Sequence, residues 1–220
     1  MPTPSEADTF RTRLYLISPS EIDLNAFEIA FKNALAGGDV ACFQLRLKNS
    51  SVAEISDTVL RLRPIAEAAN VAFLLNDDVA LARDLGVDGV HIGQDDMPYR
   101  EARTILGPDA IIGVTCKNSR DLAIEAAESG ADYVAFGAFY PSTTKSPTVA
   151  ADLELLEWWS SMVEIPSVAI GGITVENAAA LIVGGADFLA VSAGVWEFAE
   201  GPEAAVRAFN RVIDKALATC

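Results

Sequence analysis

The sequence predicts a single (β/α)8 barrel, the TIM-barrel fold, for a chain of 220 residues. Apolar, β-branched runs of strand length alternate eight times with segments whose apolar residues recur every three or four positions, as in a helix. Such an alternation is typical of a parallel sheet. The short, evenly spaced strands and the chain length favour a closed eight-stranded barrel over an open doubly wound sheet.

Each expected strand is a short apolar run, and each expected helix follows it with the helical period. The strands are 14–17, 40–47, 71–75, 89–92, 110–115, 133–137, 167–171 and 188–192. The helices are 26–35, 52–69, 79–85, 99–106, 119–129, 153–162, 175–183 and 202–217. Glycines stand where helices should end, as at Gly86 and Gly130. We expect one domain over residues 1–220, with residues 1–12 as a flexible N-terminal extension.

Composition excludes several classes of protein. A hydrophobic fraction of 51% with 21% charged residues describes a globular chain rather than a disordered one. The net charge of −15 argues against partners with anionic surfaces, both nucleic acid and membranes. Three cysteines without metal-ligand spacing indicate neither a disulfide framework nor a zinc site. With no secretory signal or apolar span apparent, a cytoplasmic location is expected; the oligomeric state stays open, a homo-oligomer included.

The end of strand 40–47 carries the first candidate site. Side chains alternate between the two faces of a strand, so Gln44, Arg46 and Lys48 are expected to point the same way. Two cations at the end of an apolar strand are tolerated only where an anion meets them. The sequence therefore predicts an anion site there.

Polar residues also close the other strands, at the rim where barrel enzymes place their chemistry. Two acidic groups, Asp77-Asp78 and Asp95-Asp96, follow neighbouring strands. They are candidates either for a shared Mg²⁺ or for helix N-caps, the second interpretation applying best to Asp78 and Asp95. Together with the cations of strand 40–47, the metal–diphosphate interpretation is preferred.

Two further rim segments have alternative interpretations. The loop Ser142-Thr143-Thr144-Lys145 is rich in hydrogen-bond donors and either folds over a ligand or is a polar surface loop. Gly171-Gly172, with Thr174 expected to cap the next helix, either lets backbone N–H groups approach an anion or serves strand-to-helix packing.

His91 is the only histidine of the chain. It either forms a Cys–His nucleophile with Cys116 or is a structural residue at the barrel top. The structural interpretation is preferred because no third orienting group is apparent. Trp158 and Trp159 are expected to pack their helix against the barrel.

With these residues in place, the chain resembles the thiamine phosphate synthase family from about residue 14 to residue 206. The matching motifs are Gln44-Leu45-Arg46-Leu47-Lys48, Leu75-Asn76-Asp77, the run from Asp88 to Pro98, Ile112-Gly113-Val114-Thr115, Ser142-Thr143-Thr144-Lys145 and Ala169-Ile170-Gly171-Gly172-Ile173. The resemblance implies a TIM barrel that joins hydroxymethylpyrimidine diphosphate to a thiazole phosphate and releases diphosphate by a dissociative mechanism.

The resemblance also implies roles for residues of this chain. Mg²⁺ would bind Asp77 and Asp96. The thiazole phosphate would meet the Ser142–Thr144 loop, Gly172 and the backbone of Ser192 and Ala193. The pyrimidine diphosphate would be held by Gln44, Arg46, Lys48, Asn76, Thr115 and Lys145, of which Arg46, Lys48 and Lys145 would also stabilise the leaving group.

The chain departs from the family pattern at a few positions. Thr115 stands where serine is usual, Ser142 where threonine is usual, and Lys117 where histidine is frequent. The segment 191–195 is shifted by one residue. Two other functions compete with the synthase: a thiazole tautomerase-like isomerase, which would require a base at the barrel mouth, and a non-catalytic barrel that binds a phosphorylated ligand.

Overall fold

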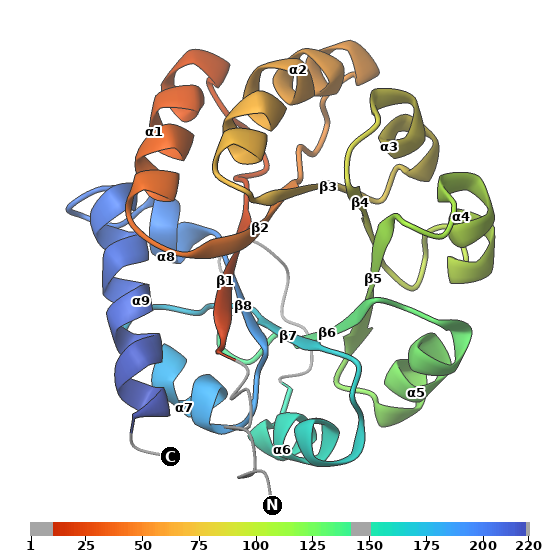
Figure 1. Ribbon diagram of the computed structural model, residues 1–220, viewed down its shortest axis with the longest axis vertical. Coiled ribbons are helices and arrows are strands. Elements are labelled where there is room, and N and C mark those ends of the chain that lie inside the picture. The colour runs from red at the N-terminus through yellow and green to blue at the C-terminus, as the bar shows by residue number, and fades with distance from the viewer. Residues whose placement is uncertain (1–10, 142–150, 219–220) are drawn as a thin grey trace, which may run out of the picture.

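A computed structural model describes residues 11–141 and 151–218, and these form a closed barrel of parallel strands surrounded by helices (Figure 1). Each strand pairs with the next one in sequence, and β8 pairs with β1 to close the barrel. The strands are β1 Arg13–Ile17, β2 Val40–Leu45, β3 Ala72–Asn76, β4 Gly89–Ile92, β5 Ile111–Lys117, β6 Tyr133–Gly137, β7 Ser167–Ile170 and β8 Phe188–Val191. The predicted (β/α)8 barrel is confirmed.

The helices form a ring outside the strands (Figure 1). They are α1 Leu24–Ala36, α2 Val52–Ala68, α3 Val79–Leu85, α4 Tyr99–Leu106, α5 Arg120–Ser129, α6 Leu153–Met162, α7 Ala178–Val183, α8 Ala193–Trp196 and α9 Pro202–Leu217. The short helix α8 was not predicted, because one turn is too short to show a helical period. Side-chain caps start several helices, including the reciprocal pair of Ser51 and Glu54 at α2.

Strand β2 ends earlier than predicted, at Leu45 rather than at residue 47. Beyond it the backbone bonds to the loop after β1 instead of to a strand. The Arg46 N–H donates to Ser18 Oγ at 2.8 Å, and the Lys48 N–H donates to Ser20 O at 2.9 Å. Arg46 and Lys48 therefore lie on a loop that is held against its neighbour.

Helix α7 begins at Ala178 rather than at residue 175, and Thr174 is not its cap. Asn177 occupies the N-cap position, and its side chain is used within the preceding loop. Its Oδ1 accepts from the Thr174 N–H at 2.8 Å, and its amide donates to Gly172 O at 2.9 Å. The loop after β7 is thus organised by an amide side chain.

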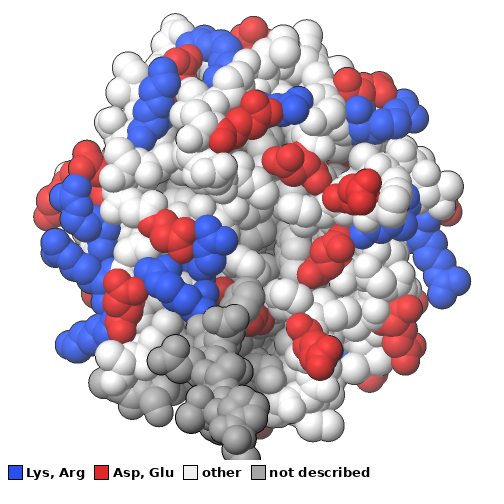
Figure 2. Space-filling view, in the orientation of Figure 1, with Lys and Arg blue, Asp and Glu red and all other residues white. Residues whose placement is uncertain are grey.

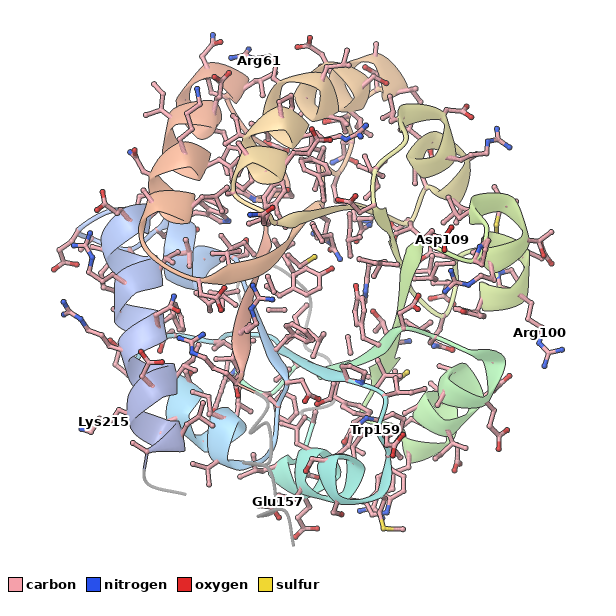
Figure 3. The ribbon with its side chains drawn as sticks, viewed as in Figure 1. Arg61, Arg100, Asp109, Glu157, Trp159 and Lys215 are labelled. Atoms are coloured by element: carbon pink, nitrogen blue, oxygen red, sulfur yellow. The ribbon has the colours of Figure 1, made fainter. Side chains whose placement is uncertain are left out.

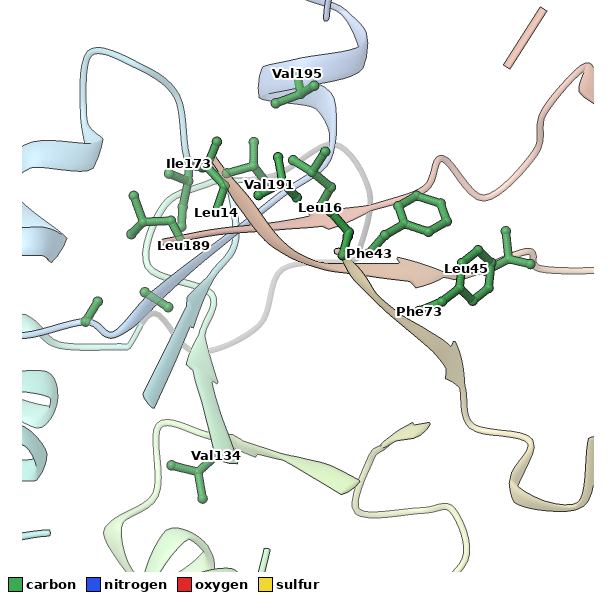
Figure 4. Close-up of a cluster of buried hydrophobic side chains, with 14 of the residues drawn as sticks. Leu14, Leu16, Phe43, Leu45, Phe73, Val134, Ile173, Leu189, Val191 and Val195 are labelled. Carbon is green, nitrogen blue, oxygen red and sulfur yellow. The ribbon is translucent and has the colours of Figure 1, made fainter. Parts of the chain in front are cut away.

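Apolar side chains pack in two layers, one on each side of the strands. The outer layer joins strands to helices and includes Leu14, Leu16, Phe43, Leu45 and Phe73 (Figure 4). The expected packing of the tryptophan pair is confirmed for Trp159, which is fully buried with its ring 5.4 Å from that of Phe136 (Figure 3). The inner layer fills the barrel and consists of Tyr15, Ile17, Cys42, Leu74, Tyr133, Ala135, Val168 and Ala190.

An aspartate precedes every second strand at the N-terminal end of the barrel. Asp88, Asp132 and Asp187 each accept a backbone N–H of the neighbouring odd-numbered strand at 2.7 Å, from Phe73, Ile112 and Ser167 respectively. Before β2, Asp39 instead pairs with Arg11 at 2.9 Å and with Arg13 at 2.7 Å. These carboxylates tie adjacent strands together at the end opposite to the expected site.

The surface carries the charges. Acidic and basic side chains are interspersed on the face shown in Figure 2. Across residues 11–141 and 151–218, no helix is both long and apolar enough to cross a membrane.

Candidate active site

Two cations and a carboxylate meet where β2 and β3 end. Lys48 Nζ lies 3.0 Å from Asp77 Oδ2, and Asp77 also attracts the half-buried guanidinium of Arg46. Burial lowers the pKa of Arg46, and the charge of Asp77 opposes that shift. The predicted convergence of Arg46 and Lys48 is found, although loop geometry rather than strand alternation produces it.

A second carboxylate stands beside the first. The pKa of Asp96 is raised above its usual range. Partial removal from water is the largest cause, and the Asp77 carboxyl within hydrogen-bonding reach adds to the shift. The Gly93 N–H donates to Asp96 Oδ2 at 2.7 Å and holds the side chain in place. Asp77 itself has a left-handed backbone, φ 66°, which non-glycine residues adopt rarely and which is frequent at functional sites.

Asp77 and Asp96 were predicted as a pair, and the structure brings them together. Asp78 is instead the N-cap of α3, where its side chain accepts from the Leu81 N–H at 2.9 Å. The N-cap alternative is therefore correct for Asp78. It is wrong for Asp95, which is exposed at the rim, because Pro98 occupies the N-cap position of α4.

The carboxylate pair fits Mg²⁺ by the chemistry of its donors. Mg²⁺ binds through oxygen atoms, commonly one or two carboxylates, with waters and substrate phosphates completing the octahedron. Asp77 and Asp96 supply two such carboxylates beside the cations that would meet a phosphate. Within the described ranges, no group of three or more His, Cys, Asp and Glu side chains is placed to hold a metal ion by itself.

Below the rim, a hydrogen-bonded chain crosses the barrel interior from β2 to β5. Gln44 Nε2 donates to the Tyr15 hydroxyl at 2.8 Å, which lies 2.9 Å from the Tyr133 hydroxyl. That hydroxyl is 2.9 Å from His91 Nδ1, and His91 Nε2 is 2.7 Å from Thr115 Oγ1. Both predicted substrate residues, Gln44 and Thr115, are thus ends of one buried polar chain.

His91 is a buried residue with both ring nitrogens in this chain, as the structural interpretation expected. The alternative Cys–His nucleophile is wrong. Cys116 belongs to the outer apolar layer, whereas His91 bonds to Tyr133 inside the barrel. Burial raises the pKa of the Cys116 thiol to about 12, so it is not a thiolate at neutral pH.

The loops after β7 and β8 lie at the same end of the barrel. Gly172 has φ 62°, and a Cβ there would lie 2.3 Å from Pro141 O, so close packing alone requires glycine. Ser192 precedes α8, and its hydroxyl bonds to Ser18 O at 3.4 Å. The packing alternative therefore accounts for the double glycine, and binding by Gly172, Ser192 and Ala193 remains a prediction.

The remaining predicted residues are Asn76 and the four residues of the loop 142–145. Asn76 is the last residue of β3 and pairs in register with His91, next to the carboxylates. Ser142, Thr143, Thr144 and Lys145 lie outside the described residues.

Sequence reasoning missed Tyr15 and Tyr133. Both are aromatic residues with polar tips on the inward face of apolar strands, and a buried tyrosine hydroxyl usually finds a partner. Tyr15 also lies on β1, directly beside β2, which ends in Gln44 and Leu45. The position of these two tyrosines on the inward face of their strands was a signal that the sequence already contained.

Comparison with known proteins shows which family the chain belongs to. A family described as thiamine monophosphate synthase matches residues 14–195. A thiamine-phosphate synthase of Rhodospirillum centenum is 58% identical over 201 residues, covering 91% of this chain and 97% of that protein. One of Hyphomonas neptunium is 56% identical over 93% of this chain and 95% of its own. The solved thiamine phosphate pyrophosphorylase from Pyrococcus furiosus superposes with a TM-score of 0.82 at 30% identity, covering 94% of this chain and 98% of that chain.

Proposed function

The chain belongs to the thiamine monophosphate synthase family, and from that premise we propose that it is a transferase of thiamine biosynthesis. It would condense 4-amino-2-methyl-5-hydroxymethylpyrimidine diphosphate with a thiazole phosphate to give thiamine phosphate and diphosphate. The observation that supports this most directly is the cluster of Arg46, Lys48, Asp77 and Asp96 at one point of the rim. It combines cations for a diphosphate with carboxylates for a cation.

In the proposed reaction the bond between the pyrimidine methylene carbon and the diphosphate oxygen breaks first. The electron pair leaves with diphosphate, and the thiazole nitrogen then attacks the pyrimidine cation. Such a reaction depends on stabilising the leaving group more than on a strong base, so Arg46 and Lys48 act as preorganised positive charges. When bound at Asp77 and Asp96, Mg²⁺ would supply Lewis-acid stabilisation of the same diphosphate.

The remaining residues position the two substrates. Gln44, Asn76 and Thr115 would orient the pyrimidine at the end of β2, β3 and β5. Gly172, Ser192 and Ala193 would meet the thiazole phosphate after β7 and β8. The loop Ser142–Lys145, outside the described residues, would contribute further donors. Small-molecule substrates and a cytoplasmic location belong to this proposal.

The competing functions are less well supported. A tautomerase requires a base at the mouth, and His91 is buried with both ring nitrogens hydrogen-bonded to neighbouring side chains. A non-catalytic ligand-binding barrel would share most of the binding residues, so only turnover separates it from the synthase.

The test is formation of thiamine phosphate and diphosphate from both substrates, with and without Mg²⁺. We expect the release of diphosphate to depend on Mg²⁺. We expect the formation of thiamine phosphate to require the thiazole phosphate as well. Asp77→Ala should lower kcat/KM on the order of 10²–10³-fold, as removal of a preorganised charge does; Lys145→Ala should act in the same way.

Asp84→Ala is the matched control, because Asp84 is an exposed carboxylate of α3 that pairs with its sequence neighbour Arg83. It should leave turnover unchanged. Tight substrate binding without turnover in the wild-type chain would contradict the synthase. Near-normal activity of Asp77→Ala at saturating Mg²⁺ would contradict the proposed site.

A further inference from the structure

The hydrogen-bonded chain inside the barrel has a polarity that its end residues determine. Its middle members are deeply buried: Tyr15 is 2% exposed, Tyr133 6% and His91 8%. Gln44 donates to Tyr15 through Nε2, which leaves Oε1 as the acceptor of that amide. The orientation of every later bond depends on how Tyr15 uses its one hydrogen.

One direction satisfies each group in turn. Tyr15 accepts from Gln44 and donates to Tyr133; Tyr133 then donates to His91 Nδ1. His91 is thereby neutral, with its hydrogen on Nε2, which donates to Thr115 Oγ1. Thr115 accepts within the chain and keeps its own hydroxyl hydrogen as a donor.

The opposite direction is less favourable. His91 would donate from Nδ1 to Tyr133, and Tyr133 would donate to Tyr15, which would then accept twice. The Tyr15 hydrogen would be left to the neighbouring Cys42 thiol, and sulfur is a weak acceptor. A buried hydroxyl without a good acceptor costs free energy.

We propose that this chain runs in one direction, from Gln44 to Thr115, and that Tyr15, Tyr133 and His91 are positioning residues for the pyrimidine substrate. They act through Gln44 and Thr115 rather than by touching the ligand. This series of hydrogen bonds leaves Gln44 Oε1 as an acceptor and the Thr115 hydroxyl as a donor for the ligand. An acceptor and a donor together suit an amino-substituted nitrogen heterocycle. This inference rests on the proposed function for the identity of the ligand.

Two features of the barrel interior support this series of hydrogen bonds. Gly113 lies opposite Tyr133 in the β5–β6 register, and a Cβ at Gly113 would lie 1.8 Å from Tyr133 Cζ. The tyrosine ring therefore occupies space that only a glycine leaves open. Burial raises the pKa of both Tyr15 and Tyr133 well above the usual value, so each keeps the hydrogen that it passes on.

The kinetic test is Tyr133→Phe, which removes the central hydroxyl and keeps the ring. We expect KM for the pyrimidine diphosphate to rise roughly tenfold, the effect of one lost hydrogen bond, with KM for the thiazole phosphate unchanged. Tyr99→Phe is the matched control, because the Tyr99 hydroxyl bonds to Gly130 O on the outside of the barrel. Equal KM values for the pyrimidine diphosphate in Tyr133→Phe and Tyr99→Phe would overturn the inference. Absence of turnover in the wild-type protein would instead overturn the proposed function.

A second test needs no substrate. The chain has one histidine, so ¹⁵N NMR of imidazole-labelled protein reports on His91 without assignment ambiguity. We expect a neutral ring with a single, slowly exchanging Nε2–H. In Tyr133→Phe the Nδ1 resonance should shift, because its donor is gone, and in Tyr99→Phe it should not. A ring protonated on Nδ1, or a Nδ1 resonance that ignores Tyr133→Phe, would overturn the inference.

Discussion

Aspartates at the two ends of the barrel have opposite surroundings. At the N-terminal end, Asp88, Asp132 and Asp187 each accept a strand N–H at 2.7 Å. At the C-terminal end, Asp96 stands beside another carboxylate, Asp77, and its pKa is raised, first by desolvation and then by that neighbour. The first arrangement stabilises the fold, because each carboxylate satisfies a buried donor.

The second arrangement costs stability and is expected where function requires it. Two ionised carboxylates in contact repel each other, and either a proton on one of them or a bound cation relieves that repulsion. Lys48 supplies part of that charge at 3.0 Å from Asp77. The same residue type therefore holds strands together at one end and prepares a binding site at the other.

The largest expected effect comes from Asp96→Asn. Loss of one of two paired carboxylates should lower kcat/KM on the order of 10²–10³-fold. Because the folded protein raises the pKa of Asp96, folding disfavours its charged form, so the neutral amide should keep or increase the free energy of unfolding near pH 7. Urea unfolding measures the free energy of unfolding, and the rate of thiamine phosphate formation measures kcat/KM. A clear loss of stability with activity retained would contradict the comparison.

Asp187→Ala should show the reverse pattern. It removes the acceptor of the Ser167 N–H at 2.7 Å and of the Ser167 hydroxyl at 3.1 Å, in a residue that is fully buried. The free energy of unfolding should fall by about 1–3 kcal/mol, the cost of a buried unsatisfied donor, while kcat/KM of the folded protein stays unchanged. Asp187→Asn keeps an acceptor and should lose less. Equal losses in the two variants would argue against the hydrogen bonds.

The smallest effect is expected at Asp39, where the hydrogen bond from Arg13 holds the pKa of the carboxyl below its usual value. A lowered pKa stabilises the fold above the unfolded pKa, and the contribution disappears as the pH falls through the folded pKa. The half-exposed pair should contribute no more than about 1 kcal/mol.

The measurement is urea unfolding of wild type and Asp39→Asn over a pH series. The difference should be present at pH 6–7, begin to shrink below about pH 4, the unfolded pKa of an aspartate, and vanish once the pH has fallen through the lower folded pKa. Asp84→Asn, at a more exposed ion pair of α3, should show little difference throughout. A difference for Asp39→Asn that grows as the pH falls would contradict this account.

Much of the rim was predictable because it depends on order along the chain. Parallel strands end at one edge, so Lys48, Asp77 and Asp96 had to lie near one another once the barrel was predicted. The alternation of strand faces placed Gln44 inside. The aspartates of the other end also left a signal, a glycine two residues or fewer before Asp39, Asp88, Asp132 and Asp187, which was overlooked.

The features that could not be predicted from the sequence depend on contacts between residues that are distant along the chain. The end of β2 at Leu45 was set by Ser18 and Ser20, on a loop far from it in sequence. His91 and Cys116 looked like partners because they lie near the ends of two neighbouring strands, β4 and β5. Only their placement on opposite sides of the barrel wall separated them.

By itself, then, the sequence determined the fold class, the rim and the residue types of the anion and cation sites. These follow from hydrophobic period and from chemistry that each residue carries alone. The tertiary structure decided which aspartate caps a helix, which pairs with another carboxylate, and that Gln44 is linked through Tyr15, Tyr133 and His91 to Thr115. The physical reason is that hydrogen bonds and pKa shifts belong to pairs of groups, and their partners are chosen by packing across the barrel.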